Sequence, residues 1–329
     1  MRMQAVVTCS FVRSLYITVM FALCLGVTAQ VRVDTTEAGA KALGETVVTA
    51  RFDRKTLRSA TPAFSIDKEK MLRNGVTDIS DAVHRLPGVT LRDYGGAGGM
   101  KTVSVRGLGS AHTAVVYDGM LLSDAQSGSI DLSRYSTDNL EELSLVIGDN
   151  DDIFISAKAA ASPATLSLAT PGMNLNGEKL QMTSQIKVGS FGYVSPFIRG
   201  TVRVGERIAL GFTGEYTHAK NDYPFDLENG NIVTREKRSH NLMNSGHGEF
   251  NLLWKTRGDG ELSAKVYYYD NNRQLPGPVL LYNVDASTGR LHDRNSFGQA
   301  VFTSRLGEKW RLRVSGKFNW SGSLYTEID

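Results

Sequence analysis

The C-terminal part of the chain is dominated by alternating polar and apolar positions. Between residues 178 and 320, seven stretches place apolar side chains on one face and polar side chains on the other. In the last of them, Trp310, Leu312 and Val314 alternate with Arg311 and Arg313. Strands of about ten residues with one apolar and one polar face are typical of a membrane-spanning β-sheet. The pattern predicts antiparallel transmembrane strands over residues 177–329.

The connections between these stretches differ in length in a regular way. Gly205–Glu206, Arg257–Asp259 and Gly307–Glu308 form tight turns, whereas residues 218–240 and 270–294 form long loops. Short turns at one end of a sheet and long loops at the other are typical of outer-membrane barrels. A soluble antiparallel sandwich also alternates, and it remains the alternative at this point.

Residues 51–176 have another pattern, which predicts a small α+β domain. Asp67 is expected to cap a short helix that ends at Asn74–Gly75, and Thr77 a second helix from Asp78 to Arg85. Short apolar strands separated by glycine-rich turns follow: Val89–Leu91, Val103–Val105 and Ala114–Tyr117.

The first 29 residues have the features of a secretory signal. An apolar run from Leu15 to Val27 follows basic residues and ends at the small residues before Gln30, which predicts cleavage after Ala29. A retained anchor helix is the alternative. Both cysteines, Cys9 and Cys24, lie in this segment, so the exported chain would carry no disulfide, thiol nucleophile or cysteine zinc site.

Residues 30–50 are predicted to form a flexible tail. It ends in the β-branched run Glu45, Thr46, Val47, Val48, Thr49 and Ala50. Such a run can add as a strand to the sheet edge of another protein. It can equally be the first strand of the domain that follows.

The composition excludes several functional classes. The formal net charge is only +3 and no dense basic cluster occurs, so nucleic-acid binding is not expected. The six histidines form no HxxxH pair, and no Ser-His-Asp signature is present. We therefore expect no enzymatic activity, no catalytic residues, no metal site and no cofactor.

Five short motifs, in chain order, resemble those of the TonB-dependent outer-membrane receptors. They are Glu45–Ala50, similar to the TonB box, then Leu86–Val89, Val105–Gly107, Val116–Gly119 and Gln274–Gly277. The resemblance implies an α+β plug domain at residues 51–176, followed by the antiparallel strands of an incomplete outer-membrane β-barrel. The family barrel has many more than seven strands, so we expect a truncated receptor that does not transport by itself. The chain departs from the family pattern at Ser144 and Ile147, where a Glu and an Arg are usual.

The resemblance also implies a function and a set of site residues. It implies active uptake of a scarce metal chelate, siderophore or cobalamin-like cofactor across the outer membrane of a Gram-negative bacterium, by a receptor that is monomeric when complete. Its partners would be TonB, the extracellular ligand and outer-membrane lipid. Arg106 is expected to latch the plug to a barrel carboxylate, Glu215 or Glu249. Ligand contacts are expected at the plug apex and outer loops: Tyr94, Gly98, Gln126, Tyr223 and Tyr282. A passive porin-like or adhesin-type β-protein is the alternative function.

Overall fold

The structure is a computed structural model that describes residues 63–96, 98–124, 127–148, 152–279 and 289–327. All of these residues belong to one compact unit, Phe52–Asp329. The predicted signal segment and the TonB box lie outside the described residues, as do Gln126 and Tyr282.

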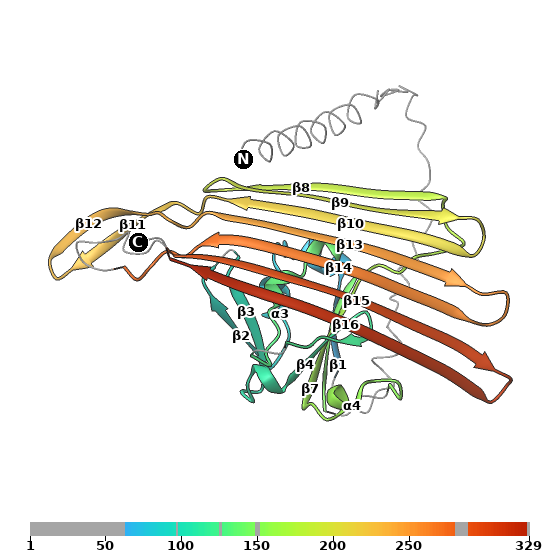
Figure 1. Cartoon of the computed structure of the whole chain (residues 1–329). Coiled ribbons are helices and arrows are strands. Elements are labelled where there is room, and N and C mark those ends of the chain that lie inside the picture. Colours follow the sequence, from blue (N-terminus) through green and yellow to red (C-terminus); the bar gives the residue numbers. More distant parts are fainter. Residues whose placement is uncertain (1–62, 97, 125–126, 149–151, 280–288, 328–329) are drawn as a thin grey trace, which may run out of the picture. The chain divides into compact units, whose positions relative to one another are not determined.

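The N-terminal part of the described chain is built on a five-stranded sheet (Figure 1). Its strands, in spatial order, are β1 (Ala63–Asp67), β6 (Glu142–Ile147), β7 (Ala164–Ala169), β4 (Thr113–Tyr117) and β5 (Met120–Leu121). β4 and β7 are parallel and the other pairs antiparallel. A separate hairpin joins β2 (Val89–Tyr94) to β3 (Met100–Val105).

Short helices connect these strands, and their first residues follow from side-chain capping. Asp67 caps α2 (Lys68–Arg73) by accepting a hydrogen bond from the Lys70 amide, as predicted. The second helix, α3 (Ile79–Val83), begins one residue later than expected because Asp78, not Thr77, accepts the capping bond from the Ser80 amide. The remaining short elements are α4 (Ala157–Ala160), η1 (Ser110–His112), η2 (Leu132–Arg134) and η3 (Thr137–Asn139).

Seven long antiparallel strands form the second sheet, in the seven stretches where the alternation predicts them. Their order in space is β16-β15-β14-β13-β10-β9-β8. Their bounds are β8 (Leu180–Gly189), β9 (Tyr193–Val204), β10 (Ile208–Ala219), β13 (Met243–Lys255), β14 (Glu261–Gln274), β15 (Arg290–Leu306) and β16 (Trp310–Thr326). In the described part of the chain, β8 and β16 are not paired with each other, so this sheet is open.

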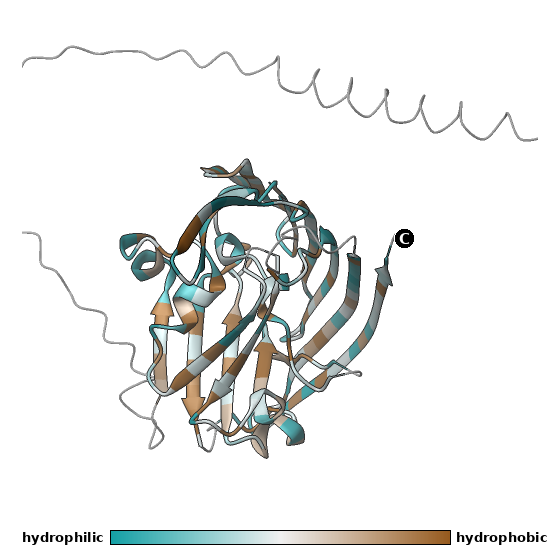
Figure 2. Ribbon diagram, turned by 90° about the vertical axis from the view of Figure 1, so that its left-hand side faces the viewer, coloured by the Kyte–Doolittle hydropathy of each residue, from teal (hydrophilic) through white to brown (hydrophobic). Residues whose placement is uncertain are grey.

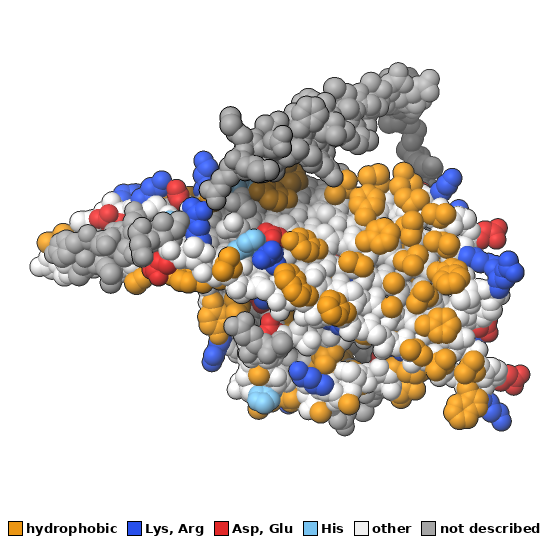
Figure 3. Space-filling model, in the orientation of Figure 1, with side chains coloured by type: hydrophobic (Ala, Val, Ile, Leu, Met, Phe, Trp, Pro, Cys, Tyr) orange, Lys and Arg blue, Asp and Glu red, His pale blue; other side chains and the backbone are white. Residues whose placement is uncertain are grey.

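The two faces of the long sheet have opposite polarity. On β14, Val266 and Tyr268 are exposed, whereas Lys265, Tyr267 and Asn271 are buried. Figure 2 shows the strands near the end marked C in alternating hydrophilic and hydrophobic bands, and Figure 3 shows hydrophobic side chains spread over the exposed face of the sheet. Apolar residues outside and polar residues inside are the arrangement of a sheet whose outer face meets lipid.

One predicted loop has regular structure. Within residues 218–240, β11 (Tyr223–Asn229) and β12 (Ile232–Arg238) pair as a hairpin that extends past the ends of the long strands (Figure 1). Among the described residues, no helix is long and apolar enough to cross a membrane.

Candidate functional site

The expected ligand residues fall in two different places. Tyr94 and Tyr223 line one cavity of about 490 Å³, which we call the outer pocket. This pocket lies between the β2–β3 turn of the first domain and the loop ends of the long strands. Its described lining residues are Tyr94, Gly95, Gly96, Phe191, Asn221, Tyr223, Arg238, Asn241, Met243, Arg273, Gln274, Leu275 and Pro276.

Gly98 does not line the outer pocket; it packs under Met243 of β13. A Cβ atom built on Gly98 would lie 1.9 Å from the Met243 sulfur, so no larger residue fits without displacing that side chain. Gly98 also has φ +74°, and its carbonyl accepts a hydrogen bond from Asn271 Nδ2 at 3.2 Å. Met243 is buried and lines both the outer pocket and the next cavity. It therefore forms the floor between the two.

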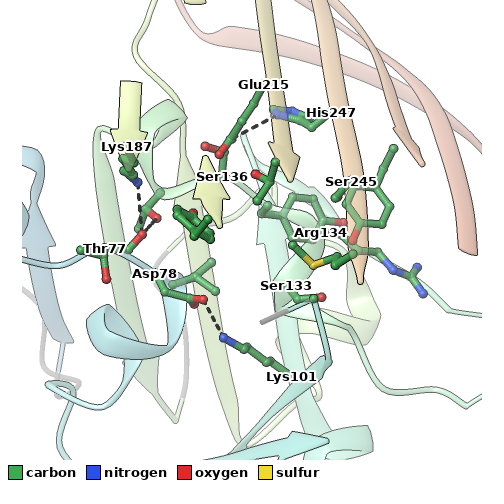
Figure 4. A pocket seen from close by; sticks show the side chains of 18 residues that line it. Thr77, Asp78, Lys101, Ser133, Arg134, Ser136, Lys187, Glu215, Ser245 and His247 are labelled. Atoms are coloured by element: carbon green, nitrogen blue, oxygen red, sulfur yellow. Dashed lines mark hydrogen bonds and ion pairs between the residues drawn. The ribbon is translucent and has the colours of Figure 1, made fainter. Parts of the chain in front are cut away.

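Beneath Met243 lies a smaller cavity of about 110 Å³, the inner cavity, whose lining includes several charged side chains (Figure 4). Two lysines reach it from different domains. Lys101 Nζ lies 2.6 Å from Asp78 Oδ2 within the first domain. Lys187 Nζ, on β8, lies 2.7 Å from Asp138 Oδ2 and 3.1 Å from the Thr77 carbonyl.

Asp78 is ionised in this setting. Burial alone would raise its pKa, but attraction to Lys101 and hydrogen bonds from Lys101 and Ser80 outweigh burial and lower the pKa below its usual value. The Asp78–Lys101 ion pair thus fixes the start of α3 against β3, at the edge of the inner cavity.

On the opposite side of the inner cavity, Glu215 and His247 face each other (Figure 4). His247 Nδ1 lies 4.0 Å from Glu215 Oε2. The other ring nitrogen of His247 is 2.9 Å from Glu249 Oε1. The histidine therefore connects the inner cavity to a deeper group of charges.

That deeper group, which we call the latch cluster, consists of Tyr117, Asp118, Glu249 and Lys265. The Glu249 side chain is 0% exposed, and Lys265 Nζ lies 2.8 Å from its Oε2 atom. The Tyr117 hydroxyl donates a hydrogen bond to Glu249 Oε1. Burial, and then the charge of Glu249, raise the pKa of Tyr117 well above its usual value, so this hydroxyl keeps its proton. A residue of the plug region and a lysine of the long sheet thus hold the same buried carboxylate.

Lys265 also holds the end of the first domain. Its Nζ atom lies 2.6 Å from Asp118 Oδ2. Asp118 in turn accepts hydrogen bonds from the backbone amide of Thr170 at 2.7 Å and from its hydroxyl at 2.8 Å. Thr170 begins the connection from β7 to β8. One lysine therefore joins β4, the interdomain connection and the barrel carboxylate.

Arg106 lies elsewhere. It is an exposed residue with φ 51° in a turn, and its guanidinium forms no ion pair with any described residue. Of the two expected partners, Glu249 is held by Lys265 and Glu215 accepts a hydrogen bond from Ser195. The latch role assigned to Arg106 therefore stays a prediction, and Lys265 is the cation that sequence reasoning missed. A charged residue on the polar face of a transmembrane strand was the signal that could have found it.

Comparisons with known proteins agree with this architecture. The TonB-dependent Receptor Plug Domain family matches residues 55–162. Among solved structures, the unliganded ferric citrate transporter FecA is similar with a TM-score of 0.59 and 13% identity, over 83% of this chain and 41% of that one. The alcaligin outer membrane receptor FauA from Bordetella pertussis is similar with a TM-score of 0.57 and 16% identity, over 82% of this chain and 40% of that one. The copper transporter OprC has a TM-score of 0.55 and 14% identity, over 74% of this chain and 34% of that one.

The present chain spans about a third to two fifths of the length of these structures. At such low identity their likeness concerns the fold. It covers both described parts, the small α+β domain and the long strands that follow it. The chain therefore carries a plug domain of the TonB-dependent receptor family, joined to antiparallel strands of the outer-membrane receptor type.

Proposed function

We propose that the chain supplies the plug and part of the barrel of an outer-membrane receptor, which binds a scarce ligand in the outer pocket and releases it inward when TonB engages residues Glu45–Ala50. The ligand would be a metal chelate, a siderophore or a cobalamin-like cofactor. The function is binding and transport without catalysis. Ferric citrate and copper appear in the names of two similar structures, and this supports a metal-containing ligand.

The latch cluster is the observation that carries this proposal. The plug meets the long sheet through specific polar contacts: Tyr117 with Glu249, Asp118 with Lys265, Asp138 with Lys187, and the Leu121 carbonyl with Lys317. It also meets the sheet through aromatic rings, where Tyr117 and Tyr135 pack against Tyr267. The polar contacts can break and reform in water, as a plug that moves during transport requires. A passive porin or adhesin would need neither a plug nor a latch.

Binding of TonB tests the proposal. The substitution Val47→Pro should abolish binding of the periplasmic domain of TonB, because proline removes a backbone donor from the added strand and fixes φ. The measurement is a pull-down with the full exported chain in detergent. Val33→Pro, in the same tail but outside the motif, is the matched control. Undiminished binding by the Val47 variant would make the segment an ordinary strand and would contradict the proposed function.

Export of the chain is a second expectation. We expect cleavage after Ala29 and recovery of the product in the outer-membrane fraction of a Gram-negative host, because an apolar run with basic residues before it ends in small residues. N-terminal sequencing of the membrane-bound product provides the check. A product that begins at Met1 would instead support the retained anchor helix.

A further inference from the structure

We infer that the outer pocket selects a negatively charged ligand, with Arg238 and Arg273 as the groups that bind its anionic part. This inference rests on the proposed function only in taking the outer pocket as the ligand site. It separates the ligand classes left open above, because a neutral cobalamin-like cofactor or a cationic chelate would not use these two side chains.

The charge of the pocket is the first observation. Arg238 and Arg273 are the charged residues among the described residues that line the pocket. The described lining includes no Asp and no Glu. The acidic side chains nearby in the sequence are already engaged. Asp93 accepts hydrogen bonds from the Gly95 and Gly96 amides at 3.1 and 2.9 Å, and Asp222 pairs with Lys237 at 3.2 Å. The lining therefore presents two positive charges, and neither Arg238 nor Arg273 forms an ion pair with a described carboxylate.

The two arginines come from separate elements that the fold brings together. Arg238 is the last residue of β12, and Arg273 lies near the end of β14. The Arg238 guanidinium donates through Nη2 to the carbonyls of Pro276, at 3.1 Å, and Gly277. Backbone carbonyls orient the guanidinium but leave its full charge in place.

Unused hydrogen-bonding capacity is the second observation. Arg238 Nη1 and Arg273 Nε have no hydrogen-bond partner among the described residues. Turning either guanidinium toward a ligand therefore breaks no hydrogen bond at these two atoms, and an acceptor on the ligand would satisfy a donor that is otherwise unpaired. Planar guanidinium groups match carboxylate, phosphate and catecholate oxygens in pairs, which a lysine ammonium does not.

The remaining lining suits a ligand that also has a flat apolar part. Tyr94, Phe191 and Tyr223 supply aromatic surface, and the rings of Phe191 and Tyr223 lie 6.0 Å apart between centroids. The volume of about 490 Å³ is in the usual range of small-molecule sites. Two guanidinium groups beside three aromatic rings favour an anion with aromatic or planar substituents.

Two iron(III) chelates that each carry three aromatic rings but differ in charge provide the test: the trianionic tris(catecholate) and the uncharged tris(benzohydroxamate). Binding to the full chain in detergent is followed by calorimetry. The trianionic chelate should bind at least about tenfold more tightly than the uncharged one. Arg238→Gln and Arg273→Gln should each weaken its binding by about ten- to a hundredfold, the range for hydrogen bonds to charged groups. Neither should change binding of the uncharged chelate.

Two further variants keep the result interpretable. Arg311→Gln, an exposed residue at the short-turn end of β16, should leave both affinities unchanged. Arg273→Lys keeps the charge but not the planar fork, and it should retain part of the affinity if Arg273→Gln acts through charge rather than through misfolding. Circular dichroism should match the unsubstituted chain in every case.

Several outcomes would overturn the inference. They are equal or tighter binding of the uncharged chelate, equal loss of both chelates in the arginine variants, and binding of neither chelate. The proposed function is tested separately, by the binding of TonB. A chain that binds TonB but not the anion refutes only the present inference, whereas a chain that binds the anion but not TonB refutes the proposed function.

Discussion

Replacing Lys265 by methionine is expected to lower the free energy of unfolding of the chain by about 3–5 kcal/mol, the usual effect of removing one partner of a buried ion pair. The Glu249 side chain is 0% exposed and would lose the ammonium group that lies 2.8 Å from its Oε2 atom, keeping the Tyr117 hydroxyl and His247 as partners. Asp118 would lose the same partner, and the end of β4 would lose its link to the long sheet. Thermal or urea unfolding of the full chain in detergent, followed by circular dichroism, measures the change.

A second substitution separates the buried charge from simple loss of packing. The double variant Lys265→Met with Glu249→Gln removes both charges, and replacing both members of a buried pair is often close to neutral. It should therefore be more stable than Lys265→Met alone. Lys309→Met, in the exposed turn between β15 and β16, is the control and should have little effect. If Lys265→Met matched this control, the latch cluster would contribute nothing to holding the plug.

The long strands could be predicted from the sequence because a sheet with lipid on one face requires strict alternation. The seven predicted stretches all contain strands, and Val266 and Tyr268 lie on the exposed face while Lys265 and Tyr267 are buried. The helix starts depend on a local side-chain bond, so they were also predictable, within one residue at Asp78. Local and periodic signals thus gave most of the fold.

One missed element did have a signal in the sequence. The sequence pattern predicts a loop over residues 218–240, yet they contain the β11–β12 hairpin, whose two turn residues are Gly230 and Asn231. Gly-Asn between two strand-forming stretches is a hairpin signal, and Gly230 has the positive φ of 61° that the first position of such a turn needs. The prediction of a loop rested on the length of the segment, and the short strands within it were therefore missed.

The candidate site could be predicted only in part, because its contacts join distant parts of the chain. Tyr117 and Glu249 are 132 residues apart in sequence, and their contact depends on how the plug packs against the long sheet. Periodicity places Glu249 and Lys265 on the inner face but says nothing about which plug residue meets them. The position of Gly98 at the plug apex predicts a ligand contact, whereas in the structure Gly98 packs under Met243.

That role of Gly98 leads to the second large effect, expected for Gly98→Ala. A Cβ atom there would lie 1.9 Å from the Met243 sulfur and 2.8 Å from its Cγ atom. The left-handed backbone at φ +74° adds about 1–2 kcal/mol for any residue other than glycine. Overpacking against a buried side chain typically costs a further ~1–3 kcal/mol. The Met243 side chain must move, and the floor between the outer pocket and the inner cavity would open.

Gly96→Ala separates these two contributions. Gly96 has a similar φ of +66°, but no atom lies within 4 Å of the position that a Cβ atom would take, so alanine there meets the backbone strain without the clash. Gly98→Ala should therefore destabilise the chain more than Gly96→Ala. In a Met243→Ala background the sulfur is absent, and the two glycine substitutions should then cost nearly the same, since the interaction energy between Gly98 and Met243 has been removed. Urea unfolding of these variants and the parent chain gives each difference. Equal effects of the two glycine substitutions in the parent chain would show that Met243 does not rest on Gly98, and the floor of the outer pocket would have to be formed by other residues.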